Sequence, residues 1–197
     1  MKHILTILTL TAVSSQGATL RINLTNSSFA GTNPFLDSSS TPLDDGDLVM
    51  LGYFSDGSSD FDKFVSIDSA SFQVGVVGGV DGAFTAAITL DDTGNFDGAP
   101  VAADYRFGMR IFDAPTEAAA ANFNTVTDDT WVFSFWNGAG PPPPSSSMSV
   151  DPGFGAEEPI WKDSDNPLQT SIVIPEPSTS LTALLGLAFL TGKRRRK

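Results

Sequence analysis

The segment YRFGMRI, residues 105–111, decides the fold class of this chain. Large apolar residues alternate along it with basic residues and glycine: Tyr105, Phe107, Met109 and Ile111 against Arg106, Gly108 and Arg110. A side-chain period of two is the pattern of a strand with one face in a core. The segment therefore predicts a half-buried β-strand whose basic residues lie on an open face.

Other segments with strand character lie on both sides of it: 19–23 (TLRIN), 48–54 (LVMLGYF), 72–77, 83–90, 131–136 (WVFSFW) and 171–174. Residues 78–82 (GGVDG) predict a hairpin connection between 72–77 and 83–90. One helix is expected at 115–122 (PTEAAAAN), where a proline and an acid precede an alanine run. The proline-rich stretch 138–155 predicts a stiff surface loop.

These short strands predict an all-β body. We expect a single β-sandwich over residues 18–174, jelly-roll-like or immunoglobulin-like, with long loops. The 18 glycines and 13 prolines among 197 residues fit such a loop-rich chain.

Charge is unevenly distributed along the chain. The formal net charge is −12, but residues 19–174 hold 22 acids and five bases, a net charge of −17. A field of that sign repels phosphate backbones, so no nucleic-acid partner is expected. It attracts divalent cations.

Histidine and cysteine are nearly absent. The chain has no cysteine and one histidine, His3. This excludes disulfides and thiolate metal sites. Without His3, catalytic triads and His-ligated zinc are excluded as well.

The N-terminus has the layout of a secretory signal peptide. A basic start precedes an apolar run at 4–13, and small residues follow at 14–18. Ser15 and Gly17 suit cleavage before Ala18. We therefore expect residues 1–17 to be removed on export.

Three features follow one another at the C-terminus. They are the tripeptide Pro175-Glu176-Pro177, an apolar stretch, and the basic run Lys193, Arg194, Arg195, Arg196 and Lys197. Residues 177–192 would span about 24 Å as a helix, barely enough to cross a membrane. The basic run would remain in the cytoplasm and place the body outside.

This tail, residues 175–197, resembles the PEP-CTERM sorting domain of bacterial exported proteins. The resemblance implies an exosortase, a membrane-embedded cysteine protease or transpeptidase, as processing partner. It implies transient anchoring in the inner membrane, cleavage near the tripeptide, and release to the cell surface or extracellular matrix. A plain single-span anchor is the alternative.

Aspartate-rich turns are the only repeated polar feature, and one of them suggests calcium. The loop after residue 90 offers Asp91, Asn95 and Asp97, and calcium favours several oxygen ligands in a flexible loop. No loop has the spacing of an EF-hand, and Asp, Asn and Gly also form ordinary turns. We therefore expect ordinary turns and no cofactor, with calcium at this loop as the alternative.

Trp131 and Trp136 are the candidate ligand-binding residues, as a sugar-stacking surface for an extracellular polysaccharide. Being five apart, they would face opposite sides of a regular strand, so we expect at least one in the core. The function expected first is a non-enzymatic surface or matrix protein. A carbohydrate-binding module is the alternative, and a glycoside-active enzyme using paired carboxylates comes third.

Overall fold

The computed structural model describes residues 18–28, 31–54, 59–77, 79–91, 105–136, 141, 144–150 and 159–175. The expected signal peptide (1–17), most of the proline-rich stretch and everything after Pro175 lie outside the described residues.

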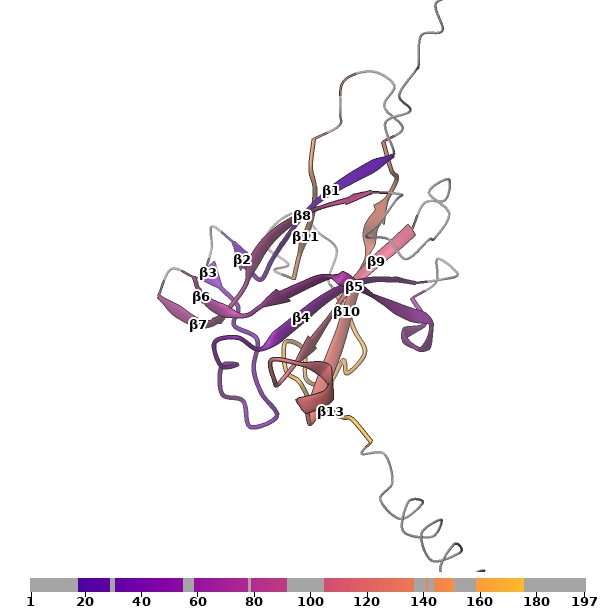
Figure 1. The fold of residues 1–197 in the computed structure, drawn as a ribbon. Helices are drawn as coiled ribbons and strands as arrows, with labels where there is room; N and C mark the ends of the chain where they lie inside the picture. The colour runs from indigo at the N-terminus through magenta and orange to yellow at the C-terminus, as the bar shows by residue number, and fades with distance from the viewer. Residues whose placement is uncertain are drawn as a thin grey trace, which may run out of the picture.

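The larger sheet has six strands and is antiparallel between all its neighbours. Its main order is β12 (Ile160–Trp161), β10 (Asn122–Phe133), β9 (Tyr105–Phe112), β4 (Leu48–Phe54) and β5 (Phe64–Gln73). The short β13 (Ile172–Val173) pairs with the first residues of β10. Because β9 occupies the other edge of β10, β12 and β13 share one edge. Figure 1 labels β13 together with β10, β9, β4 and β5 of this sheet.

The smaller sheet has three strands, with β1 (Thr19–Thr25) in the middle. β8 (Thr85–Asp91) pairs with β1 antiparallel, and β11 (Ser146–Ser149) pairs with it in parallel. Two small hairpins complete the strands: β2 (Ser27–Ser28) with β3 (Gly31–Thr32), and β6 (Gly75–Val77) with β7 (Val80–Ala83).

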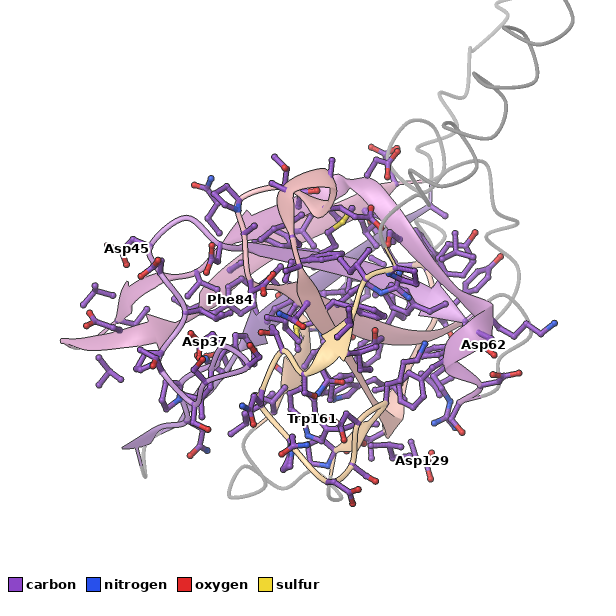
Figure 2. The ribbon with its side chains drawn as sticks, turned by 90° about the horizontal axis from the view of Figure 1, so that it is seen from below. Asp37, Asp45, Asp62, Phe84, Asp129 and Trp161 are labelled. Carbon is purple, nitrogen blue, oxygen red and sulfur yellow. The ribbon has the colours of Figure 1, made fainter. Side chains whose placement is uncertain are left out.

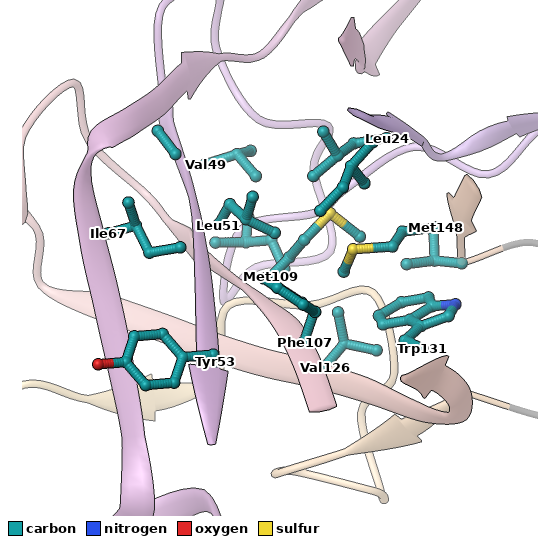
Figure 3. Close-up of a cluster of buried hydrophobic side chains, with 14 of the residues drawn as sticks. Leu24, Val49, Leu51, Tyr53, Ile67, Phe107, Met109, Val126, Trp131 and Met148 are labelled. Atoms are coloured by element: carbon teal, nitrogen blue, oxygen red, sulfur yellow. The ribbon is translucent and has the colours of Figure 1, made fainter. Parts of the chain in front are cut away.

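One hydrophobic core joins the two sheets. Along β1, Leu20, Ile22 and Leu24 are buried while Arg21 and Asn23 are exposed, as a period of two requires. Figure 3 shows Leu24 and Met148 of the smaller sheet facing side chains of the larger one. The prediction of an all-β body is therefore confirmed.

β9 confirms the alternation of its sequence, but its second face is not open. The Arg110 guanidinium lies 4.6 Å from the centre of the Phe64 ring and 5.1 Å from that of Phe123. Burial lowers the pKa of Arg110, while Glu117 acts in the opposite direction. Aromatic side chains from β5 and β10 thus cover the part of this face around Arg110, and the expectation of an open basic face is wrong.

The expected helix at 115–122 is also wrong. Only the 3₁₀ turn η2 (Glu117–Ala119) forms there, and a second such turn, η1 (Phe61–Lys63), precedes β5. The Asp113 carboxylate accepts hydrogen bonds from the backbone N–H groups of Ala121 and Asn122, both at 2.9 Å, and directs the chain into β10. Eight residues are too few to stabilise a helix against such tertiary contacts.

The hairpin expected from 72–77 and 83–90 forms only in its inner part. β6 and β7 make a short hairpin, whereas β8 crosses to the other sheet and pairs with β1. Asn26 holds this crossing, because its amide accepts from the N–H of Phe84 and donates to the carbonyl of Gly82.

Candidate functional site

The C-terminal end of the described body is a short strand at the edge of the larger sheet. Asn122 pairs with Val173 and Phe123 with Ile172. The Ile174 N–H then donates to the Ala121 carbonyl at 2.9 Å. Pro175 is the next residue and the last one that the structure describes. The described strand pairing therefore ends directly before the Pro-Glu-Pro tripeptide.

The residues before β13 are fixed much more firmly. Thr170 is fully buried, and both its N–H and its hydroxyl donate to the Leu36 carbonyl. The next residue, Ser171, donates its hydroxyl to the Asp163 carboxylate. Hydrogen bonds from Ser171 and Asn166 lower the pKa of Asp163 below its ordinary 3.8.

Asn124 fastens the same loop to β10. Its buried amide donates to the carbonyls of Gln169 (2.8 Å) and Asn166 (3.3 Å) and accepts from the Asp163 N–H (3.2 Å). The sequence gives little indication of this role, since the partners lie about 40 residues further along the chain.

The structure describes only the first residue of the sorting tail. Pro175 is the last described residue, whereas Glu176, Pro177 and the basic run at 193–197 lie outside the described ranges. No helix within the described ranges is long and apolar enough to cross a membrane.

An acidic hollow lies between the segment that precedes β4 and the residue that follows β9. It has a volume of about 360 Å³, and its carboxylates come from Asp37, Asp44, Asp47 and Asp113. Asp47 is only 6% exposed and accepts from the Asp44 N–H at 3.0 Å. Burial raises the pKa of Asp47 above its ordinary 3.8, partly offset by that hydrogen bond, and the charges of Asp44 and Asp113 raise it further.

This hollow is chemically acidic but not an evident metal centre. Among the residues that the structure describes, no group of three or more His, Cys, Asp or Glu side chains is arranged to hold a metal ion. Of the calcium ligands expected from the sequence, Asp91 ends β8 opposite Thr19, whereas Asn95 and Asp97 lie outside the described residues. Calcium at that loop therefore stays a prediction.

The two candidate tryptophans do not form a shared stacking surface. Trp131 is 1% exposed and packs in the core, where Figure 3 shows it near Val126 and Met148. Trp136 is half-buried and makes an isolated bridge with Thr19. A third, Trp161, borders an apolar hollow of about 490 Å³ but is itself only 8% exposed.

One comparison with known proteins gives a match. The family described as the PEP-CTERM protein-sorting motif matches residues 173–197, so the chain carries that motif at its C-terminus. The search of curated proteins finds no match, and the search of solved structures finds none either. The match begins at the last residue of β13 and covers the tail, not the body.

Proposed function

We propose that this chain is an exported substrate of an exosortase-type enzyme, which processes it at Pro175-Glu176-Pro177 and releases the body to the cell surface or extracellular matrix. The observation that carries the proposal is the sorting motif at residues 173–197. The motif also begins where strand pairing of the body ends, at Val173 to Pro175.

The order of the parts supports this route. A folded body precedes the Pro-Glu-Pro tripeptide, then an apolar stretch, then five basic residues. In a membrane, the basic run favours the cytoplasmic side, which leaves the body and the tripeptide outside. The tail then serves as a temporary anchor that is lost from the mature protein.

A non-enzymatic role for the body is part of the proposal. The sequence supports it, because residues 4–197 contain neither histidine nor cysteine. A strongly acidic body also suits a protein that must stay soluble among anionic surface polymers.

Two matched substitutions test the proposal in cells that contain an exosortase. Glu176→Ala changes the tripeptide, whereas Glu158→Ala changes another glutamate that is followed by a proline. Wild type and E158A should appear outside the cell without the basic run, as intact-mass spectrometry measures. E176A should stay in the membrane fraction with its tail.

Extracellular wild-type protein that retains residues 193–197 would overturn the proposal. Equal processing of E176A and wild type would show that the tripeptide is not the signal.

A further inference from the structure

The strand β13 differs from the rest of the larger sheet in how weakly it is held. It has two residues and pairs with only two residues of β10. Val173 is 69% exposed, and Ile172 and Ile174 are only half-buried. Detaching these residues would expose little core surface, so most of the apolar free energy of folding would remain.

The attachment becomes strong immediately before this strand. Thr170 is buried with two hydrogen bonds to Leu36, and Ser171 is bound to Asp163. Asn124 holds the preceding loop from the other side. Separation of β13 from β10 would therefore stop near Thr170 and leave the body folded.

Pairing of β13 occupies the backbone directly before the Pro-Glu-Pro tripeptide. A protease commonly binds its substrate as an extended segment with backbone hydrogen bonds of its own. Here the residues directly before Pro175 use one backbone edge to pair with β10, up to the Ile174 N–H. No unpaired residue separates this pairing from the tripeptide.

We propose that β13 is a releasable strand and that its detachment from β10, with the body still folded, frees the backbone directly before the Pro-Glu-Pro segment for the processing enzyme. This inference rests on the proposed function. Freeing residues 171–174 gives the tripeptide up to about 14 Å of additional reach, at 3.3–3.6 Å per extended residue. The body then need not unfold or press against the membrane for the segment to enter an active site.

The absence of cysteine allows a direct test in the full chain. Because Ile174 and Ala121 share a hydrogen bond, the alternation of an antiparallel ladder makes Asn122 and Val173 a non-hydrogen-bonded pair. Such pairs bring Cα atoms to about 4.5 Å, within the range of a disulfide. Asn122→Cys with Val173→Cys would therefore lock β13 onto β10.

A matched control lies in the other sheet. The backbone N–H of Asn26 donates to the Phe84 carbonyl, so the alternation along β1 and β8 makes Asn23 and Ala87 a non-hydrogen-bonded pair as well. Both side chains are exposed. Asn23→Cys with Ala87→Cys places one disulfide in the same body without contacting β13.

Each variant is incubated, in its oxidised form and separately in its reduced form, with membranes that process the wild-type chain. We expect oxidation of the β10–β13 pair to slow tail removal about tenfold or more, reduction to restore it, and the control pair to have no effect. Processing of the oxidised β10–β13 variant at the wild-type rate would overturn the inference. So would equal slowing by the control disulfide.

Membranes that fail to process wild type, although they process another exosortase substrate, would instead refute the proposed function.

Hydrogen exchange on the wild-type full chain in detergent gives a second readout that does not depend on processing. The Ile174 amide should exchange about tenfold faster or more than the Thr170 amide, because only the first is released with β13. Equal protection of the two amides would show that β13 opens only with its neighbours, and would overturn the inference.

Discussion

Trp131 shows how a single residue changes role when it is placed in three dimensions. It is among the largest fully buried side chains of the described body, whereas Trp136 is half-buried at a bridge to Thr19. An aromatic side chain without an exposed ring face stabilises the fold and offers nothing to a sugar.

Truncation of the two tryptophans should therefore have unequal effects. Trp131→Ala is expected to lower the free energy of unfolding by about 3–5 kcal/mol, through lost burial and a residual cavity. Trp136→Ala should lower it clearly less. Urea unfolding followed by fluorescence measures both, and equal losses would show that Trp131 is not a core residue.

Asp47 should make the stability of the body fall as pH rises. A salt-bridged carboxylate has the opposite effect. Its pKa is raised above 3.8 in the folded state, mainly by burial. The folded state then binds the proton more tightly than the unfolded state, so stability falls as pH rises from 3.8 through the raised pKa. Above the raised pKa, Asp47 is ionised in both states, and the folded state bears the full free-energy cost of burying this charge.

Asp47→Asn removes this penalty while keeping an acceptor for the Asp44 N–H. The melting temperature of D47N minus that of wild type should therefore increase as the pH is raised from about 3.5 to about 7. Asp45→Asn, on an exposed residue of the same loop, controls for the loss of one charge. A relative melting temperature of D47N that falls over this interval would contradict the burial of an ionised Asp47.

At the scale of elements, a pair of glycines explains how the larger sheet accommodates its aromatic side chains. Gly52 of β4 and Gly108 of β9 are direct register partners. A Cβ on Gly52 would lie 2.3 Å from the Phe64 ring and 2.5 Å from the Val65 carbonyl. The missing side chain thus makes room for the ring on which Arg110 stacks.

Gly52→Ala should therefore be destabilising although alanine has the higher strand propensity. We expect a loss of about 1–3 kcal/mol from overpacking, measured by urea unfolding. Gly75→Ala in β6 is the control, because a Cβ there meets nothing within 4 Å. Similar stability of the two variants would mean that Phe64 moves aside without cost.

The elements predicted correctly are those with a local apolar pattern. β4 spans residues 48–54 as expected, and β1 and β9 follow their alternation. The first half of β10 was missed because its buried residues include Asn124, Thr127 and Asp128. Asn124 and Thr127 bond to distant partners, such as the Phe107 carbonyl for Thr127, and sequence spacing does not reveal such pairs. Asp128 instead accepts from Thr130, two residues further along the chain.

The candidate sites also differ in whether the local sequence reveals them. The sorting motif is contiguous in sequence, and its prediction at the C-terminus is confirmed by the family match. The acidic hollow brings Asp113 to the loop of Asp37 and Asp47, a contact that only the fold creates. The strength of the Thr170 attachment likewise depends on Leu36, more than 100 residues away.

At the scale of the whole molecule, the described chain begins and ends at opposite ends of the body (Figure 1). Thr19 pairs with Asp91 and Trp136 at one end, and β13 lies at the other. A body anchored through β13 would hold its Thr19 end away from the membrane. The described surface there, including Asp91, would be the first to meet a partner from outside.

The excess of acids should make the stability of the whole body depend on salt. Residues 19–174 carry 22 acids and five bases, and labelled aspartates lie on opposite sides of the body in Figure 2, with Asp37 and Asp45 far from Asp62 and Asp129. Spread charges of one sign repel one another, and added ions screen that repulsion. Sodium chloride should raise the melting temperature by several degrees, and calcium must be judged against that baseline.

At equal ionic strength, millimolar calcium should raise the melting temperature further if the loop after Asp91 binds it. A ligand specific for the native state adds about 2.7 kcal/mol at a hundredfold excess over its dissociation constant. Asn95 supplies a neutral amide where a carboxylate would bind more tightly, so we expect a smaller gain. Asp97→Asn should abolish this gain, whereas Asp81→Asn, on an exposed residue of the β6–β7 hairpin, should keep it. If calcium does no more than matched sodium in wild type, the loop is an ordinary turn and the charge of the body acts only through screening.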